Sequence, residues 1–360
     1  MHEEDSDLDI NGFTTDSFDL FIIDLKSTFF SKTKFPKLIV GTGLSIAYGI
    51  SGMSGLSKEL EREFGKLADC ESKSLWDSLK ADINDKGLEE GLKGINLGVG
   101  SNMEFVNFVR NVTAKFLLNE EINKTENFYN KTGFSRLLDY LRKSASTNNP
   151  LLDIMTPNYD RIIENVCDYL CINCIDGFKG NFKKSFDASL LRHPKEFYNK
   201  QVFSVRLYKP HGSLGWILLN GKIKSVTDNK LLLENTDNIQ IVTPGNAKYE
   251  LALTNDTFRQ TRESFNEAIN QNDFSFVIFG YGFNDEHFNT VIYSKIDHVN
   301  SLIISKDIRS EVIDMAQKNH KMVLIYQIDG VDLIVYKGKT YTIDQHMWNI
   351  DVFSNVLFAE

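Results

Sequence analysis

The sequence predicts an α/β protein with a doubly wound, largely parallel sheet and an inserted helical module. In the C-terminal half, apolar strand segments alternate with helical patterns, as expected of βαβ units. Near the N-terminus a short apolar run, 37–40, leads into a glycine-rich turn. From about residue 56 to 150 the chain has almost no β-rich run and several amphipathic stretches. We therefore expect an N-terminal helical extension over residues 1–35 and an α/β domain over 36–360, with a helical insertion at about 56–150.

The composition is that of a folded protein without a membrane segment. The chain has 360 residues, 42% hydrophobic and 12% aromatic, enough for one large core or two modest ones. Its net charge of -9 argues against direct nucleic-acid binding by the surface as a whole. The acidic N-terminus lacks the features of a signal peptide, and no apolar run approaches about 18 residues. We expect a cytoplasmic protein that does not bind membranes.

Helical patterns dominate the first part of the chain. Asp16 or Ser17 is expected to cap a first helix, whose apolar residues run from Phe18 to Phe29. A second helix is expected to start at residues 46–48, after the glycine-rich turn. The predicted insertion contains three clear amphipathic stretches, at 56–67, 103–118 and 134–141.

Strand patterns return after the predicted insertion. They cover 151–155, 205–208, 275–279, 301–304 and 322–326, and helical patterns lie between the last three. Asn220-Gly221 suits a two-residue hairpin turn, and a second hairpin is expected at Lys337-Gly338. A final helix is expected to close on the core through Met347, Trp348, Phe353 and Leu357.

The cysteines do not predict a metal site. Three of the four, Cys167, Cys171 and Cys174, have the spacing C-x3-C-x2-C of an iron–sulfur motif. The first two occur in an apolar helical pattern, which predicts two buried residues on one helix face. A zinc ribbon would need two C-x2-C pairs, and the chain has one. We expect no bound metal and, with so few cysteines, no disulfide scaffold.

The turn Gly41-Thr42-Gly43-Leu44-Ser45 is suited to bind an anion. Glycines at positions 41 and 43 let backbone amides approach a phosphate, and the following helix adds partial positive charge. Ser45 can bind a phosphate or cap that helix. The same pattern can also simply connect a strand to a helix.

Two other nucleotide-binding motifs fit less well. The dinucleotide fingerprint of reductases needs a glycine or alanine at Ile46 and an acidic residue after a second strand. A P-loop ending at Gly338-Lys339-Thr340 would have Leu333 in place of its first glycine, and it would lie in a predicted hairpin. Both motifs are therefore disfavoured.

Polar residues directly follow three further predicted strands. Asn158 and Asp160 follow 151–155, His211 follows 205–208, and the segment 280–285 follows 275–279. The carboxyl ends of parallel strands meet at one edge, where open α/β sheets bind ligands. The pKa of histidine suits a general base near neutral pH. Structural roles are the alternative: a helix cap for Asn158, and a packed or surface histidine at position 211.

Together and in this order, the four segments resemble those of the sirtuin family. The resemblance implies a Rossmann-like fold, with an NAD-binding domain over residues 36–360. It implies that Asn158 positions water or ribose, that Asp160 contacts the nicotinamide amide, and that His211 acts against the ribose hydroxyls. Gly280 and Tyr281 are implied to line the ribose and adenine side, and Asp285 can act there or cap a helix.

The expected residues then divide into two groups. Catalysis is expected from Asn158 and His211. NAD binding is expected from Gly41, Thr42, Gly43, Ser45, Asp160, Gly280, Tyr281 and Asp285.

The departures from the family pattern concern deacylation. Deacetylating sirtuins continue the glycine loop as Gly-Ile-Pro-Asp-Phe-Arg, whereas residues 49–54 lack the acid, the aromatic residue and the arginine. The zinc ribbon is also missing. What remains is similar to the zinc-free bacterial branch found in anti-phage defence, whose members hydrolyse NAD and often act with an ATPase of the HerA type, a nucleic-acid sensor or another activating partner. The resemblance implies NAD as substrate, with nicotinamide and ADP-ribose as products. Because an NAD hydrolase that acts alone would harm its host, we expect it to be controlled by assembly into a homo-oligomer or by a partner protein.

Three other functions stay open from the sequence. A protein deacylase would consume NAD only with an acyl-lysine peptide. A sensor would bind NAD or ADP-ribose without turnover. An oxidoreductase fits least, because the site residues suit cleavage of the nicotinamide–ribose bond better than hydride transfer.

Overall fold

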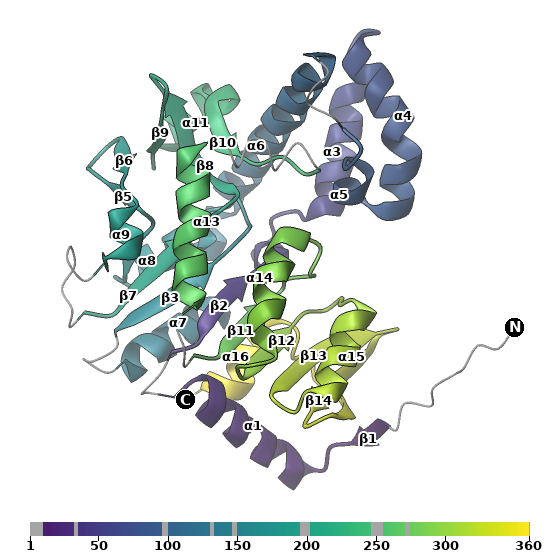
Figure 1. Ribbon diagram of the computed structural model, residues 1–360, viewed down its shortest axis with the longest axis vertical. Helices are drawn as coiled ribbons and strands as arrows, with labels where there is room; N and C mark the ends of the chain where they lie inside the picture. Colours follow the sequence, from purple (N-terminus) through teal and green to yellow (C-terminus); the bar gives the residue numbers. More distant parts are fainter. Residues whose placement is uncertain are drawn as a thin grey trace, which may run out of the picture.

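The computed structural model describes residues 10–31, 35–95, 100–129, 133–145, 150–194, 202–245, 255–270 and 274–359. Over these ranges the chain forms a mixed α/β structure with a parallel-rich central sheet, compatible with a Rossmann-like fold (Figure 1). The described part of the central sheet has ten strands, and a second sheet has five. No helix in these ranges is long and apolar enough to cross a membrane.

The middle of the central sheet is parallel and buried. Its strands lie side by side in the order β12 (Ser301–Ile304), β11 (Phe276–Phe279), β2 (Lys37–Val40), β3 (Leu151–Met155), β7 (Ser204–Tyr208) and β4 (Asn173–Ile175). Each adjacent pair in this series is parallel. Every residue of β2, β11 and β12 is buried, which explains their almost continuously apolar sequences.

The winding of the sheet reverses between β2 and β11. From β2 the chain extends the sheet through β3 to β7, whereas β11 and β12 extend it from the other side of β2. Because these five strands are parallel, their carboxyl ends lie at one edge of the sheet. This reversal is the position at which open α/β sheets bind ligands.

Three further strands continue the sheet beyond β12: β13 (Met322–Ile328), β14 (Val331–Tyr336) and β15 (Lys339–Ile343). The predicted hairpin at Lys337-Gly338 is confirmed, since it joins β14 to β15 with φ angles of 51° and 76°. β1 (Ile10–Gly12) pairs in parallel with β15 at the edge.

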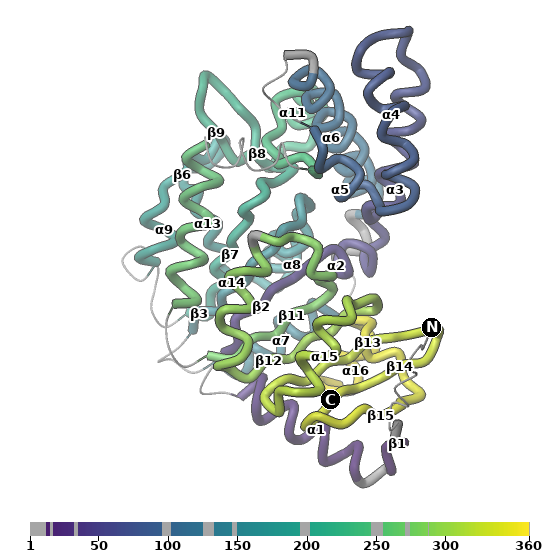
Figure 2. Tube along the Cα trace, turned by 45° about the vertical axis from the view of Figure 1, so that its right-hand side comes forward, coloured from purple at the N-terminus to yellow at the C-terminus, as the bar shows by residue number. Residues whose placement is uncertain are grey.

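Helices cover both faces of the central sheet (Figures 1 and 2). One face packs on α1 (Thr15–Phe29), α7 (Gly133–Ser144), α8 (Ile162–Tyr169) and α16 (Ile350–Phe358). The other face packs on α13 (Asp256–Ile269), α14 (Glu286–Ile296) and α15 (Ser310–Lys318). The helical patterns predicted between the last strands are therefore confirmed as α14 and α15.

Several helices connect β2 to β3 before α7: α2 (Thr42–Ala47), α3 (Met53–Gly65), α4 (Glu71–Lys86), α5 (Leu88–Gly91) and α6 (Gly100–Tyr129). Helices α3 to α6 share an apolar core that includes Leu60, Trp76 and Phe105. The long helix α6 also enters the main core through Ala114 and Leu118. In Figures 1 and 2, helices α3 to α6 form a group at one end of the molecule.

The second sheet is antiparallel, with the order β10 (Ile239–Ile241), β8 (Gly212–Leu219), β9 (Lys222–Ser225), β6 (Lys184–Phe186) and β5 (Phe178–Lys179). The predicted hairpin at Asn220-Gly221 is confirmed, with φ angles of 51° and 72° between β8 and β9. Short helices accompany this sheet: α9 (Ser189–Arg192), α11 (Asn229–Glu234) and the 3-10 turn η1 (Thr236–Asn238). Because β8 begins directly after His211, this sheet helps to fix that histidine.

Two helix starts differ from the predictions. Thr14, rather than Asp16 or Ser17, caps α1, because its hydroxyl accepts the Ser17 amide at 3.3 Å. Helix α2 begins at Thr42, immediately after an extended Gly41, so Ser45 lies within the helix and does not cap it.

The C-terminal helix and the cysteines also need correction. Helix α16 begins at Ile350, so Met347 and Trp348 precede it, and Asn349 is its cap. Cys167 is buried on α8 as predicted, but Cys171 is exposed with φ of 55°. The helix ends before this residue in a turn toward β4, so the prediction of two buried cysteines on one helix face is wrong for Cys171.

Candidate active site

A cavity of about 1030 Å³ lies at the carboxyl ends of β2, β3, β7, β11 and β12. Nine of the ten predicted site residues line it: Thr42, Gly43, Ser45, Asn158, Asp160, His211, Gly280, Tyr281 and Asp285. The tenth, Gly41, is the buried residue that joins β2 to α2. The structure therefore brings the four separate segments together around one space.

The glycines of two site loops are required by close backbone packing. A Cβ atom on Gly43 would lie 2.5 Å from the Gly280 Cα atom, and one on Gly41 would lie 2.4 Å from the Gly280 oxygen. The Gly43 amide donates to the Gly280 carbonyl at 2.9 Å, and the Gly41 amide donates to Phe279 at 2.8 Å. Gly280 itself has φ of +60°, which favours glycine. These two amides are engaged within the protein, where we had expected them to face a phosphate.

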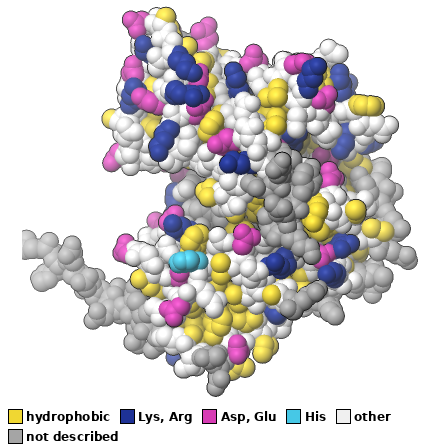
Figure 3. All heavy atoms as spheres, turned by 180° about the vertical axis from the view of Figure 1, so that it is seen from behind, with side chains coloured by type: hydrophobic (Ala, Val, Ile, Leu, Met, Phe, Trp, Pro, Cys, Tyr) yellow, Lys and Arg dark blue, Asp and Glu magenta, His cyan; other side chains and the backbone are white. Residues whose placement is uncertain are grey.

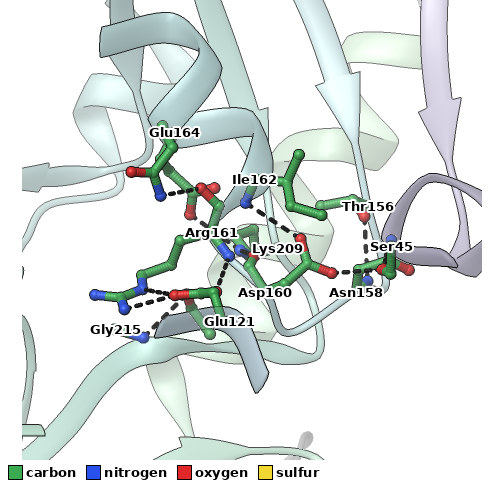
Figure 4. A network of polar contacts seen from close by, with 12 residues as sticks. Ser45, Glu121, Thr156, Asn158, Asp160, Arg161, Ile162, Glu164, Lys209 and Gly215 are labelled. Atoms are coloured by element: carbon green, nitrogen blue, oxygen red, sulfur yellow. Dashed lines mark hydrogen bonds and ion pairs between the residues drawn. The ribbon is translucent and has the colours of Figure 1, made fainter. Parts of the chain in front are cut away.

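A chain of hydrogen bonds links Asn158, Ser45 and Asp160 (Figure 4). The Asn158 amide nitrogen donates to the Gly41 carbonyl at 2.8 Å and to the Ser45 hydroxyl at 3.0 Å. The Ser45 hydroxyl donates in turn to Asp160 Oδ2 at 2.5 Å. Since both amide hydrogens of Asn158 are used here, its side-chain oxygen is the atom that can accept a hydrogen bond from a bound molecule.

Asp160 is a buried carboxyl whose pKa is raised. Burial is the main cause, and it outweighs the opposing effects of the Lys209 charge and of the hydrogen bond from Ser45. The Ile162 amide donates to Asp160 Oδ1 at 3.2 Å. Lys209 is itself buried, and it donates to the backbone oxygen of Asp160 and to Glu164 Oε1. A neighbouring cation and two donors therefore fix this carboxyl (Figure 4).

His211 and Asp285 form a buried pair that also lines the cavity. His211 Nε2 lies 3.2 Å from Asp285 Oδ2, and both side chains are at most 10% exposed. Asp285 Oδ1 also accepts the Phe288 amide at 3.3 Å, so the same carboxylate caps α14 and contacts the histidine. The Phe288 ring packs 5.0 Å from the imidazole, between ring centroids. The imidazole is thus held by a carboxylate and by an aromatic ring.

Tyr281 supports the same loop. Its hydroxyl donates to Asn289 Oδ1 at 2.9 Å, and the Asn289 amide donates to the Phe283 carbonyl at 2.7 Å. Burial, followed by the charge of Asp285, raises the pKa of Tyr281, so its hydroxyl stays protonated at neutral pH.

Two adjacent carboxylates on α6 hold two of the site loops. Glu120 accepts the backbone amide and the hydroxyl of Ser51, both at 2.8 Å. Glu121, which is 1% exposed, accepts the Arg161 amide at 2.6 Å and its guanidinium Nε at 2.7 Å. Ser51 lines the cavity, and Arg161 directly follows Asp160 (Figure 4). Helix α6 thereby sets the position of both loops.

Some lining residues were missed by the sequence prediction. Residues 305–307 follow β12, and the rule that ligands bind after parallel strands could have found them. Glu89 comes from α5, and Trp348 and Asn349 precede α16. No motif marks these residues, because only the packing of distant elements brings them to the cavity.

The described residues contain no group of three or more His, Cys, Asp or Glu side chains arranged to hold a metal ion. On the face seen in Figure 3, acidic and basic side chains are intermixed rather than gathered into one patch of a single sign.

The cavity lies at the reversal of a parallel sheet and is lined by a glycine turn and polar strand ends, the position at which open α/β sheets bind ligands. Residues 153–306 match the family model described as SIR2-like domain. This match supports a sirtuin-like family and fits NAD-dependent activity in general. The matched range begins within β3 and contains Asn158, Asp160, His211 and the loop 280–285. A search of curated proteins found no match.

Proposed function

We propose that the protein is an NAD hydrolase that cleaves the nicotinamide–ribose bond to give nicotinamide and ADP-ribose. The observation that carries the proposal is the convergence of two fixed polar groups on one cavity. Asn158 is locked through Ser45, and His211 is paired with Asp285. The SIR2-like match over residues 153–306 supports NAD as the molecule that binds there.

The chemistry of this bond suits the residues present. When the bond breaks, its electron pair moves onto the pyridinium nitrogen, so nicotinamide leaves as a neutral molecule and needs no general acid. The ribose carbon becomes cationic and is captured by water, which then loses a proton. The site must therefore stabilise the ribosyl cation, direct one water molecule and accept its proton.

Each role is assigned to one side chain. His211 accepts the proton from water, directly or through a ribose hydroxyl, and Asp285 orients the imidazole and stabilises its protonated form. The Asn158 side-chain oxygen orients the water or the ribose. Asp160, with its raised pKa, faces the nicotinamide amide.

The loops at Gly41–Ser45 and Gly280–Tyr281 are proposed to hold the rest of NAD. Because the Gly41 and Gly43 amides are bonded to the neighbouring strand and loop, Thr42 is the loop residue best placed to meet the diphosphate. Lys306 also lines the cavity, next to Trp348, with its ammonium 5.2 Å from the ring centroid. This lysine is the cation that can face a phosphate there.

Product analysis separates this function from its alternatives. The purified protein is incubated with NAD alone and with NAD plus an acetyl-lysine peptide, and the products are resolved by chromatography. A hydrolase yields nicotinamide and ADP-ribose without the peptide. A deacylase releases nicotinamide only when the peptide is present, together with O-acetyl-ADP-ribose and the deacetylated peptide. A sensor yields no product but is stabilised by NAD.

The biological role is a further part of the proposal. A protein that depletes NAD without control would harm its own cell, so we propose an anti-phage defence effector that is active only as a homo-oligomer or with an activating partner, such as a HerA-type ATPase. In this proposal α3 to α6 are the inserted module of the NAD-binding domain. A specific activity that stays constant at all protein concentrations and with every partner tested would contradict this proposed regulation.

A further inference from the structure

One carboxylate in the cavity comes from outside the four site segments. Glu89 lies on α5 and lines the same space as Asn158, His211 and Asp285. It belongs to the helices that connect β2 to α7, whereas the other three residues come from the ends of central strands. Figure 1 shows α5 on the side of its helical group that faces α14.

Packing on several sides fixes the backbone segment that carries Glu89. The neighbouring Leu88 and Leu92 are 3% and 1% exposed in the core of α3 to α6. Gly245, beyond β10, approaches so closely that a Cβ atom there would lie 2.6 Å from the Leu92 oxygen. Lys93 pairs with Glu286 at 3.2 Å, and Glu286 directly follows Asp285. The α5 segment is therefore tied to the loop that carries Asp285.

The charge of Glu89 acts on two tyrosines that line the cavity. Burial is the main cause that raises the pKa of Tyr159, and the negative charges of Glu89 and Asp285 raise it further. The same two carboxylates, after burial, raise the pKa of Tyr281. Tyr159, Tyr281, His211 and Asp285 all line the cavity that Glu89 lines, so the carboxylate of Glu89 belongs to the same site.

We propose that Glu89 is a catalytic residue, whose carboxylate faces the ribose and stabilises the positive charge that develops there as nicotinamide leaves. This inference rests on the proposed NAD hydrolysis. Glu89 makes no bond: the electron pair leaves with nicotinamide, water attacks the ribosyl cation, and the proton goes to His211. A negative charge at this position favours the cationic transition state over the more diffuse charge of bound NAD.

The test compares Glu89→Gln with wild type and with Glu89→Asp. We expect Glu89→Gln to lower kcat by about 100-fold to 1,000-fold, with little change in KM, because one preorganised electrostatic group is lost. Glu89→Asp keeps the charge on a shorter side chain and is expected to regain part of that loss. Calorimetric binding of ADP-ribose and the melting temperature should match wild type, since neither requires the ribosyl cation.

A matched control removes a carboxylate from the same helical group outside the cavity. Asp85 is exposed in the last turn of α4, and Asp85→Asn is expected to keep full activity. A Glu89→Gln protein that folds, binds ADP-ribose and hydrolyses NAD at the wild-type rate would overturn the role of Glu89 alone. A wild-type protein that binds ADP-ribose but never hydrolyses NAD, with or without its partners, would overturn the proposed function and this inference together.

Discussion

The contact between His211 and Asp285 gives one carboxylate two tasks that can be separated. One oxygen of Asp285 caps α14, and the other lies 3.2 Å from the imidazole. Asparagine is as good a cap as aspartate, but it carries no charge to stabilise a protonated imidazole. Position 285 therefore offers a substitution that affects chemistry more than folding.

We predict that Asp285→Asn lowers kcat roughly 100-fold while the melting temperature changes little, because the cap is kept and the general base loses its charged partner. The measurement is steady-state NAD hydrolysis beside thermal unfolding. Asp285→Ala should lower both quantities. Equal kcat in Asp285→Asn and wild type would remove His211–Asp285 from the mechanism.

The raised pKa of Asp160 predicts that the stability of the protein depends on pH. Burial raises its pKa above the ordinary aspartate value of 3.8, so the folded protein holds this proton more tightly than the unfolded chain. The stabilising contribution of the bound proton is complete below pH 3.8. It is lost as the pH rises through the pKa of the folded protein, because the buried carboxyl must then ionise.

The Asp160→Asn variant has no titrating side chain at this position. As the pH rises from about 4 to 7, the free energy of unfolding of the variant should therefore increase relative to that of wild type. Urea unfolding at several pH values measures the difference. Parallel curves for the two proteins over this range would show that Asp160 has no raised pKa in the fold.

At the scale of elements, the central feature is the close approach of two loops. The loop after β2 and the loop after β11 touch through Gly43 and Gly280, which leaves no room for a side chain. The sequence marked both glycines, Gly43 for binding an anion and Gly280, through the family resemblance, for lining the ribose and adenine side of NAD. Their contact with each other depends on the adjacency of β2 and β11, which are separated by more than 200 residues in the chain, so it could not be predicted locally.

We predict that Gly43→Ala destabilises the protein by about 1 to 3 kcal/mol, because the new methyl group would overlap the backbone of Gly280. The affinity for NAD should fall as well, since both loops line the cavity. Gly65→Ala at the end of α3 is the matched control, because nothing lies within 4 Å of its added Cβ atom. Similar stability of Gly43→Ala and this control would contradict the tight loop contact.

The elements themselves were largely predictable. Buried parallel strands have apolar runs with polar ends, and both hairpins carried residues that accept positive φ. The strands β5, β6 and β10 were missed because each is only two or three residues long, too short for a strand pattern to be recognised in the sequence. The start of α2 was misplaced because Thr42 and Gly43 are weak helix formers, which the tertiary contact with Gly280 holds in helical geometry.

On the scale of the whole molecule, the residues that line the site come from two kinds of segment. Four segments with recognisable motifs follow the central strands, and the sheet order brings them together. Glu89, Ser51 and Trp348 come from helices and loops without motifs, and only the packing of the full chain delivers them. A sequence can therefore predict which strand ends carry chemistry, whereas the walls of the cavity require the fold.

The central claim is that this cavity hydrolyses NAD, and nicotinamide release by wild type and Asn158→Ala tests it most directly. Asn165→Ala is the control, because this asparagine also donates to a backbone oxygen, that of Arg161, but does not line the cavity. We predict release by wild type and the control, and a loss of about 100-fold to 1,000-fold in Asn158→Ala with ADP-ribose binding retained. Equal nicotinamide release by all three proteins would contradict the account.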